Sequence, residues 1–249
     1  MRSKAFFING GAGRVICSIP ALEKYAEESG DKDFVIVAEG GTDFYKGHPT
    51  LYSRVYDNWH KNLFEDKLKD MDIETPEPYR VWEYYNQKCN LTQAFDIAIN
   101  GKGVRDLAKP TLKLSVQETL PAKQVIQEVK EKNKKDKVIV FQPFGRGTVV
   151  TEEGYVTDTS GRSFEATHTI NIVKGLQKAG YAVIIMSEFG IDFKEHGCKD
   201  PVAMPQNVPV RTWAAIIGEA DLFLGCDSVG QHIAYSLDIP SVVVMGSTY

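Results

Sequence analysis

The chain has 249 residues, of which 43% are hydrophobic and 25% charged, and this composition is typical of a soluble globular protein with one large or two medium domains. The formal net charge of −4 gives no general attraction for nucleic-acid phosphates, so we expect no nucleic-acid partner. No apolar run approaches the roughly 20 residues of a membrane-spanning helix, and the N-terminal apolar run is too short for a signal peptide. We expect a cytoplasmic protein, and the alternative that it acts at the inner face of a membrane stays open.

Short apolar runs alternate with helical patterns along the chain. The predicted strands are Lys4–Asn9, Asp33–Ala38, Ser53–Tyr56, Phe95–Asn100, Lys137–Gln142, Tyr181–Met186, Asp221–Leu224 and Ser241–Met245. The predicted helices are Ile19–Glu28, Pro121–Lys134, Ser163–Ala179, Thr212–Gly218 and Gly230–Leu237. Near-continuous apolar strands that alternate with helices predict an α/β protein with doubly wound parallel sheets.

The organisation is doubled, because each half opens with a strand that runs into a glycine-rich turn. The first strand leads into Asn9–Arg14, and Lys137–Gln142 leads into a turn that contains Gly145 and Gly147. A polar connector flanked by prolines separates the halves. We therefore expect two Rossmann-like domains, residues 1–115 and 116–249. Within the N-terminal half, the aromatic-rich segment Trp59–Asn90 has no clear strand, and we expect helices and loops there. Its aromatic side chains serve either ordinary packing or an acceptor-binding surface.

The turn at Asn9–Arg14 is a weak ligand signal. Glycines let a backbone approach a ligand closely, and a following helix offers unpaired N–H groups to an anion. The dinucleotide fingerprint is incomplete, however, because the next small position after Gly11 and Gly13 is Ser18. A tight structural turn explains the pattern about as well as a ligand loop. A Rossmann-type dehydrogenase is a further, weaker hypothesis for the function, because the glycine fingerprint for its cofactor is incomplete.

Two arginines in the second half are candidate phosphate ligands. Arg146 follows Gly145 in the second glycine turn, and its guanidinium is suited to bidentate phosphate contacts. A loop, Thr148–Ser160, comes next and is of the length that often carries function. Arg162 then precedes a predicted helix, where its charge opposes the helix dipole unless an anion binds. Arg162 is thus either a phosphate ligand or a surface arginine.

The strongest site is predicted at Asp227–His232. Asp227 and Ser228 follow a buried strand, and Gly230 and His232 lie at the start of the next helix. The carboxyl end of a parallel strand is where ligands bind in such sheets. Helix capping by Asp227 and Ser228 is the structural alternative. His232 can donate a hydrogen bond to an anion in either charge state.

The sequence offers no metal-ligand spacing and no disulfide framework. The four cysteines are far apart and form no CxxC pair, which favours reduced, buried thiols. The histidines have no spacing typical of zinc ligands. There is also no GxSxG motif, which excludes the usual serine hydrolase.

The segment from Trp213 to Thr248 closely resembles glycosyltransferase family 9, the ADP-heptose:lipopolysaccharide heptosyltransferases. The family pattern is D-[ST]-G-x-x-H, followed by an alanine-rich helix, a proline, a buried strand and G-x-T. The matching positions are Asp227, Ser228, His232, Pro240, Gly246 and Thr248. The glycine is displaced, with Val229 at the family position and Gly230 one residue later.

Three earlier segments are similar to the same family. Gly13–Leu22 is similar to its opening G-D-x-x-x-x-x-P-x-L, Gln142–Gly145 resembles its strand and P-G turn, and Arg162 stands where the family has Lys or Arg before a helix. The resemblance implies a GT-B fold, in which two Rossmann-like domains face a central cleft. The N-terminal domain would be the acceptor side and the C-terminal domain would bind the sugar nucleotide. Family members continue past the last motif, so the second domain is expected to be truncated relative to them.

The resemblance implies transfer of a heptose-like sugar from a nucleotide-diphosphate donor, ADP-sugar favoured, to a glycan or lipid-linked acceptor such as lipopolysaccharide. The reaction would invert the anomeric centre, without a cofactor or an essential metal. Arg162 would contact the diphosphate, Glu188 the ribose and Val208 the base. The candidate nucleotide-sugar-binding residues are Gly11, Gly13, Arg14, Gly145, Arg146, Arg162, Glu188, Val208, Asp227, Ser228, Gly230 and His232.

The general base is where the chain departs from the family. The family has an aspartate directly after the glycine, whereas this chain has Arg14, which stays protonated and cannot accept a proton. Glu39 and Asp43, after the second predicted strand, are the candidate bases. The alternative is a relative that binds nucleotide sugars without transferring them.

Overall fold

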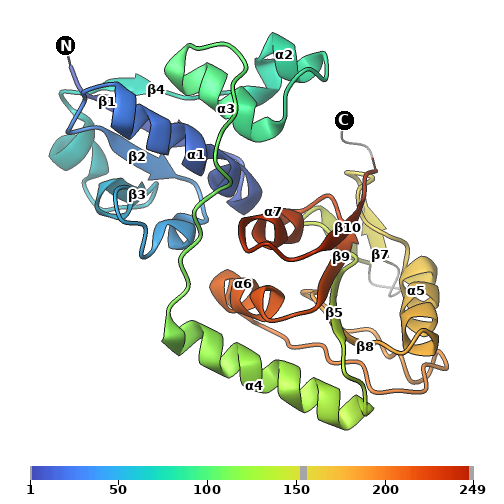
Figure 1. The fold of residues 1–249 in the computed structure, drawn as a ribbon. Helices are drawn as coiled ribbons and strands as arrows, with labels where there is room; N and C mark the ends of the chain where they lie inside the picture. Colours follow the sequence, from blue (N-terminus) through green and yellow to red (C-terminus); the bar gives the residue numbers. More distant parts are fainter. Residues whose placement is uncertain (1, 152–155, 247–249) are drawn as a thin grey trace. The chain divides into compact units, whose positions relative to one another are not determined.

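The computed structural model describes residues 2–151 and 156–246, and the chain divides into two compact units, Met1–Lys113 and Leu114–Tyr249 (Figure 1). The boundary expected from the sequence, between residues 115 and 116, lies two residues further along the chain than this division. Each unit has its own parallel sheet.

Unit 1 contains a four-stranded parallel sheet of order β3-β2-β1-β4. The strands are β1 (Lys4–Ile8), β2 (Val35–Ala38), β3 (Val55–Asp57) and β4 (Asp72–Glu74). The inner strands β1 and β2 pair in parallel register, with Ala5 opposite Val35. Parallel strands need coverage on both faces. The segment with Leu63 and Leu68 packs on one face, and helices cover the other.

The helices of unit 1 are α1 (Ala12–Glu28), α2 (Trp82–Tyr85) and α3 (Leu91–Asn100), and α1 packs against α3. Beneath α1, the ring of Phe6 meets those of Tyr25 and Phe34 edge-on, at centroid distances of 4.7 and 6.3 Å. These aromatic contacts fix the direction in which α1 leaves the carboxyl end of β1.

Two predictions for unit 1 were wrong. Phe95–Asn100 is the second half of α3 and not a strand, because Asn90 and Gln93 form a capping box and Gly101 ends the helix in the left-handed region (φ 64°). Helix α1 begins seven residues before the predicted Ile19, so Pro20 lies inside it. The sequence also missed β4, which is three residues long and carries two acidic residues.

Unit 2 contains a parallel sheet of order β10-β9-β5-β8. Its strands are β5 (Val138–Gln142), β8 (Ala182–Ile185), β9 (Leu222–Cys226) and β10 (Ser241–Val244). The helices are α4 (Val116–Asn133), α5 (Ala166–Lys178), α6 (Val210–Gly218) and α7 (Val229–Ser236). Helix α4 begins before the predicted Pro121, since Ser115 and Glu118 form its N-terminal cap.

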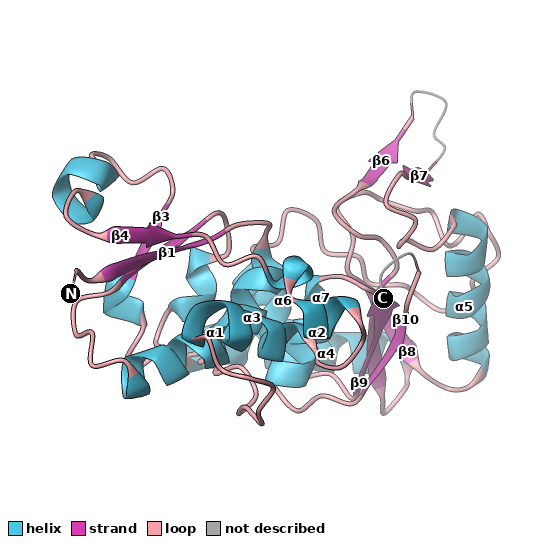
Figure 2. Ribbon diagram, turned by 90° about the horizontal axis from the view of Figure 1, so that it is seen from above, coloured by secondary structure: helices cyan, strands magenta, loops and turns pink. Residues whose placement is uncertain are grey.

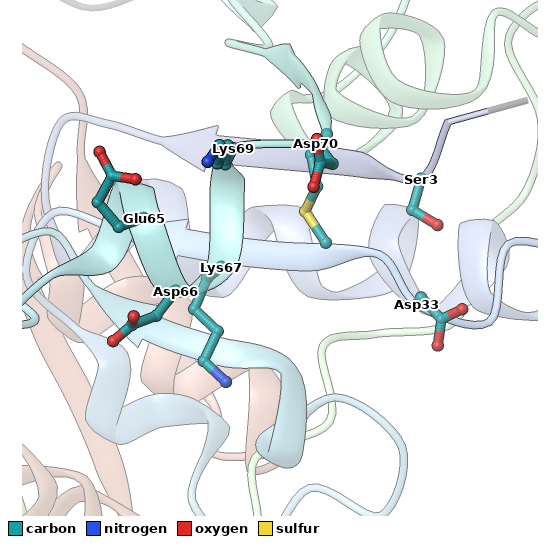
Figure 3. A pocket seen from close by; sticks show the side chains of 8 residues that line it. Ser3, Asp33, Glu65, Asp66, Lys67, Lys69 and Asp70 are labelled. Atoms are coloured by element: carbon teal, nitrogen blue, oxygen red, sulfur yellow. The ribbon is translucent and has the colours of Figure 1, made fainter.

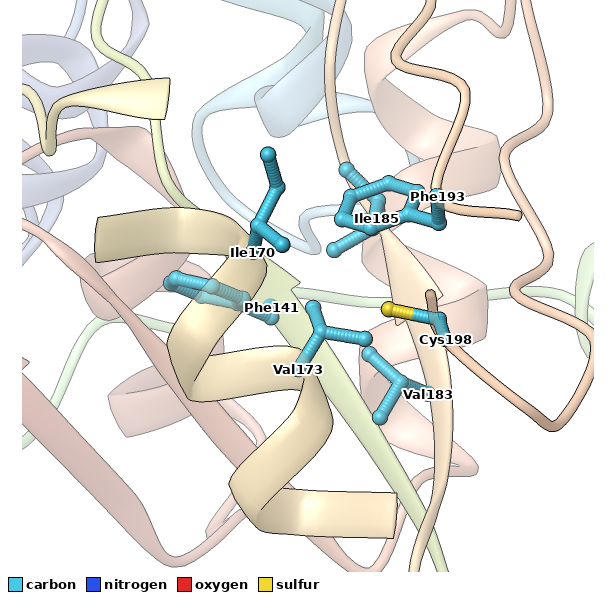
Figure 4. Packing of buried hydrophobic residues seen from close by; sticks show 7 residues of the cluster. All are labelled: Phe141, Ile170, Val173, Val183, Ile185, Phe193 and Cys198. Atoms are coloured by element: carbon cyan, nitrogen blue, oxygen red, sulfur yellow. The ribbon is translucent and has the colours of Figure 1, made fainter. Parts of the chain in front are cut away.

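Helices cover both faces of this sheet: α5 lies on one, and α4, α6 and α7 lie on the other (Figure 1). On the α5 face, Ile170 and Val173 of the helix point at Phe141 and Val183 of the strands (Figure 4). This doubly wound arrangement leaves the carboxyl edge of the sheet for loops.

The segment predicted as the loop Thr148–Ser160 contains a two-stranded antiparallel ribbon, β6 (Thr148–Val150) and β7 (Val156–Asp158). Figure 2 shows this ribbon projecting beyond the sheet. Four residues of the predicted loop, 152–155, lie outside the described residues. The pairing of Thr148 with Asp158 brings the two ends of the segment together, next to the turn that follows β5.

Candidate functional site

The central strands β5 and β9 of unit 2 end side by side, with Gln142 opposite Gly225. The loops that follow them therefore meet at one edge of the sheet. Two glycines permit the close packing there. A Cβ on Gly225 would lie 2.7 Å from the ring of Phe223, and a Cβ on Gly230 would lie 2.5 Å from both Phe223 and Oε1 of Gln142. Only glycine lets helix α7 start this close to the sheet.

The start of α7 is capped by Gln142 and not by Ser228. The Gly230 N–H donates to Oε1 of Gln142 at 3.0 Å. Ser228 stands at the N-cap position, but its side chain makes no capping hydrogen bond. Its hydroxyl oxygen instead accepts a hydrogen bond from Nε2 of Gln142 at 3.2 Å. The structural alternative for Ser228, helix capping, therefore does not apply.

Arg162, which precedes α5, reaches the same edge. Its Nη1 donates to the backbone oxygen of Asp227 at 3.5 Å, and its Nε donates to Oγ of Ser160 at 3.2 Å. The segment after β10 closes on this loop, because a Cβ on Gly246 would lie 2.3 Å from the backbone oxygen of Gly161. The structure thus brings Arg162, from the loop before α5, together with Asp227 and Ser228, from the loop between β9 and α7. Thr248, the last residue of the sequence motif, lies outside the described residues.

A carboxylate that the sequence did not single out organises the loop that carries Arg162. Asp158 accepts hydrogen bonds from the backbone N–H and hydroxyl of Ser160, at 2.7 and 2.6 Å, and from the N–H and hydroxyl of Ser163, at 3.0 and 2.5 Å. Partial burial opposes ionisation of Asp158, but these hydrogen bonds outweigh it and lower its pKa to about 2. Ser163 in turn accepts a hydrogen bond from the Gly145 N–H at 2.9 Å, which links the loop to the turn after β5.

His232 lies in the first turn of α7, beside Asp227. Burial lowers the pKa of His232, and the nearby charge of Asp227 opposes that shift. The net shift favours the neutral imidazole, which still donates one hydrogen bond. The Asp227 carboxylate itself accepts a hydrogen bond from the side chain of Gln231, one turn into the helix. Both predicted residues are therefore held at the helix start.

Three predicted residues lie on other loops of unit 2. Arg146 is exposed directly after the buried Gly145, Glu188 is exposed beyond the end of β8, and Val208 is partly buried before α6. Within the described part of the chain, no hydrogen bond or ion pair ties any of them to Arg162.

In unit 1, the glycine turn leads directly into α1, with Gly10 and Gly11 both at φ 91°. Arg14 lies in the first turn of the helix and faces an acid. Its guanidinium is 3.3 Å from Oε1 of Glu77 and donates to the backbone oxygen of Pro76 at 3.3 Å. Its side chain is 13% exposed. Arg14 is therefore a largely buried cation paired with a carboxylate.

The aromatic rings of Tyr79 and Phe95 lie 5.1 and 5.7 Å from the Arg14 guanidinium. Such cation–π contacts add to the ion pair in holding the side chain. Tyr79 comes from the aromatic-rich segment that the sequence left open between packing and acceptor binding. Its neighbour Trp82, on α2, is 59% exposed and packs against the ammonium group of Lys88, 4.3 Å from the ring centroid. Tyr79 is itself 47% exposed, so both aromatic side chains keep a large part of their surface open to solvent.

The carboxyl edge of the unit 1 sheet collects acids from two strands. Glu39 follows β2 directly, and its backbone N–H donates to the oxygen of Ile8 at 3.1 Å. Asp43 lies in the short 3₁₀ turn Thr42–Tyr45 after the same strand, and both side chains are exposed. Glu77 lies beyond the end of β4, the other neighbour of β1. The sequence missed Glu77, because β4 itself has no sequence signal.

A cavity of about 270 Å³ lies at the opposite edge of unit 1 (Figure 3). Ser3 and Asp33, which precede β1 and β2, line it, together with charged residues of the segment around Lys67. It lies at the amino ends of the strands, whereas parallel sheets bind ligands at their carboxyl ends. None of the residues predicted from the sequence to bind a ligand lines it.

Among the described residues, no helix combines the length and apolar character needed to cross a bilayer. Over the same residues, no three or more His, Cys, Asp or Glu side chains gather in a way that could hold a metal ion.

No protein-family model and no curated protein matches the sequence. Solved structures do match. The glycosyl transferase family 9 protein from Veillonella parvula aligns with 100% of this chain and 82% of its own, with a TM-score of 0.69 and 11% identity. ADP-heptose lipopolysaccharide heptosyltransferase II from E. coli aligns with 97% of this chain and 84% of its own (TM-score 0.63, 12% identity). E. coli heptosyltransferase WaaC, solved with ADP-2-deoxy-2-fluoro heptose, aligns with 99% of this chain and 90% of its own (TM-score 0.59, 12% identity). The chain therefore has the α/β fold of the GT-B glycosyltransferases of family 9, as its C-terminal motif predicted.

Proposed function

We propose that this protein is a glycosyltransferase that binds a nucleotide-diphosphate sugar on unit 2 and transfers the sugar to a glycan or lipid-linked acceptor. The observation that carries the proposal is the meeting of Arg162, Asp227, Ser228 and His232 at the start of α7. Ligands of open parallel sheets bind at this edge. The fold that the chain shares with family 9 structures, at 11% and 12% identity, is consistent with the proposal.

The cluster has the chemistry that a diphosphate leaving group needs. Arg162 supplies a cation, the start of α7 supplies the positive end of a helix dipole, and Ser228 and neutral His232 supply hydrogen-bond donors. Negative charge builds up on the diphosphate as the glycosidic bond breaks. Preorganised donors stabilise that charge without a metal ion.

For the rest of the donor we follow the family resemblance, which implies that the ribose lies near Glu188 and the base near Val208. Gly145 and Arg146 would lie beside the phosphates. ADP is the favoured nucleotide, because one of the similar E. coli proteins is an ADP-heptose heptosyltransferase and another was solved with an ADP-sugar analogue. The sugar would be heptose-like and the transfer inverting. Unit 1 would be the acceptor side, and a lipid-linked acceptor would bring the protein to the inner face of a membrane.

Transfer needs a general base that takes the proton of the acceptor hydroxyl. Glu39 and Asp43 are the candidates from the sequence, and Glu77 is a third. Arg14 cannot accept a proton, but it holds the Glu77 carboxylate at the glycine turn of unit 1. Arg14 is also the observation that favours the alternative function, a protein that binds a nucleotide sugar and does not transfer it.

Calorimetry with ADP, UDP and GDP, followed by mass spectrometry of ADP-heptose turnover on candidate glycan acceptors, tests both functions. Binding with transfer supports the glycosyltransferase, and binding without transfer on any acceptor selects the alternative. If none of the nucleotides binds to folded protein, both are wrong. Where transfer is seen, Glu39→Gln, Asp43→Asn and Glu77→Gln identify the base as the variant that abolishes turnover while ADP affinity is kept.

A further inference from the structure

A glutamine at the end of β5 links the turn after that strand to Ser228 and to the start of α7. Gln142 is 6% exposed and ends a strand whose other residues are apolar. Its Oε1 accepts from the Gly230 N–H at 3.0 Å, and its Nε2 donates to the backbone oxygen of Phe144 at 3.3 Å and to Oγ of Ser228 at 3.2 Å. A buried polar side chain with both ends in use has one stable orientation.

The orientation of the Gln142 amide follows from its partners. A backbone N–H only donates and a backbone carbonyl only accepts, so Oε1 must face Gly230 and Nε2 must face Phe144. An amide flipped by 180° would lose both bonds and oppose like groups. The group that Gln142 presents to Ser228 is therefore a donor, and Oγ of Ser228 can only accept from it.

We propose that Gln142 is a positioning residue for the donor diphosphate: it caps α7 in place of Ser228 and turns the Ser228 hydroxyl hydrogen toward the bound phosphate. The inference rests on the proposed function, because the ligand is the diphosphate assigned there to unit 2. A serine that capped the helix would use its oxygen on the backbone. Here the oxygen is engaged by Gln142, and the hydrogen is left to donate to an acceptor-only ligand such as a diphosphate.

The inference makes a specific prediction for Gln142→Glu. The glutamate oxygen can still cap Gly230, and the positive end of α7 keeps it ionised. It no longer donates, so the Ser228 hydroxyl must turn to donate to it, away from the ligand. Ser228→Ala removes the same donor directly. We expect each variant to weaken ADP binding by about tenfold, the cost of one hydrogen bond to a charged group.

The double variant separates orientation of the hydroxyl from simple charge repulsion. If Gln142 acts through Ser228, then Gln142→Glu in the Ser228→Ala background should bind ADP within about twofold of Ser228→Ala alone. If the introduced charge simply repels the diphosphate, Gln142→Glu should weaken ADP binding by the same factor in the Ser228→Ala background as in the unaltered protein. Calorimetric ADP titration of the full chain measures all four affinities.

Gln177 provides the matched control. It is 7% exposed, and its Nε2 donates to the backbone oxygen of Asp200 at 2.8 Å, near the end of α5 away from the site. Gln177→Glu introduces the same charge and loses the same kind of bond, and it should lower the melting temperature without changing ADP affinity. An equal loss of ADP affinity in this control would overturn the inference.

Three further results would also overturn it: wild-type affinity in Ser228→Ala, wild-type affinity in Gln142→Glu, or additive losses in the double variant. If Gln142→Glu does not fold, the Ser228→Ala result alone decides whether the hydroxyl donates to the ligand. Failure of the unaltered protein to bind ADP, UDP or GDP would instead refute the proposed function, so the two failures are distinguishable.

Discussion

Glu118→Gln tests the ion pair that fastens the first helix of unit 2 to the rest of the unit. Glu118, in the first turn of α4, meets Arg211 of α6 with Oε1 2.5 Å from Nε and Oε2 2.9 Å from Nη2. Arg211 is 7% exposed. Ser115 adds hydrogen bonds from its N–H and its hydroxyl, both at 2.8 Å. Glutamine keeps the size and its oxygen can still serve the helix cap, while its NH2 group replaces the oxygen that accepts from Nε of Arg211, so the variant removes the charge and one hydrogen bond of the pair.

The pKa of Glu118 gives the magnitude. The hydrogen bonds from Arg211, aided by those from Ser115 and opposed by burial, lower it from 4.5 to about 2. At about 1.4 kcal/mol for each pKa unit this corresponds to roughly 3 kcal/mol. Solvent screening at a side chain that is 19% exposed reduces the expected loss to about 2 kcal/mol in the free energy of unfolding of unit 2.

Urea unfolding followed by circular dichroism measures this loss, and its pH dependence has a definite sign. Because the folded pKa is lowered, the stabilisation is fully present above about pH 5 and disappears as the pH falls toward 2. The difference between wild type and Glu118→Gln should therefore shrink over that range. Glu128→Gln, on the same helix with a side chain 65% exposed, is the control and should cost less than about 0.5 kcal/mol. A pH-independent difference, or equal costs for the two variants, would refute the reasoning.

Three further predictions concern the candidate site. Arg162→Ala should weaken ADP binding by at least about tenfold in calorimetry with little change in melting temperature, and unchanged affinity would remove Arg162 from the site. Gly230→Ala places a Cβ 2.5 Å from Gln142 and Phe223, so it should lower the free energy of unfolding by about 1–3 kcal/mol in urea titration; full stability would contradict the packing at the start of α7. Asp158→Asn should weaken ADP binding through the loop that carries Arg162, and its destabilisation should fade as the pH falls from about 4 to 2, since the lowered pKa of Asp158 confines its contribution to higher pH. A stability difference that persists at pH 2 would refute that assignment.

Most strands of the two parallel sheets were predictable, because strands that are buried on both faces consist of continuous apolar runs. β5 and β8 are buried along their whole lengths, and the predicted ranges matched them within a residue or two at each end. The error at Phe95–Asn100 has a physical cause: its β-rich composition is overridden by the cap at Asn90 and by burial of one helix face. The hydrophobic pattern of only six residues does not distinguish a strand from a segment of a buried helix.

The candidate site was predictable only where the residues carry charge or follow a strand. Arg162 and Asp227 were identified from their places in the sequence, and the structure joins them. Gln142 and Asp158 were missed, because nothing local in the sequence distinguishes a polar residue that caps a helix 88 residues away or orders a loop. The Arg14–Glu77 pair was likewise out of reach, since its partners are 63 residues apart.

The strand order of the two sheets sets different conditions for folding during synthesis. In unit 1 the inner strand β1 finds both neighbours within the first 74 residues, with Lys4 opposite Asp72. In unit 2 the inner strand β5 needs β9, with Ile139 opposite Leu222, and β9 then needs β10. Pairing across such separations is slow, and a chain emerging from the ribosome folds its N-terminal part first. A nascent chain halted near residue 200 would therefore carry a completed first sheet and an open apolar edge on β5, the state most exposed to aggregation and most dependent on chaperones.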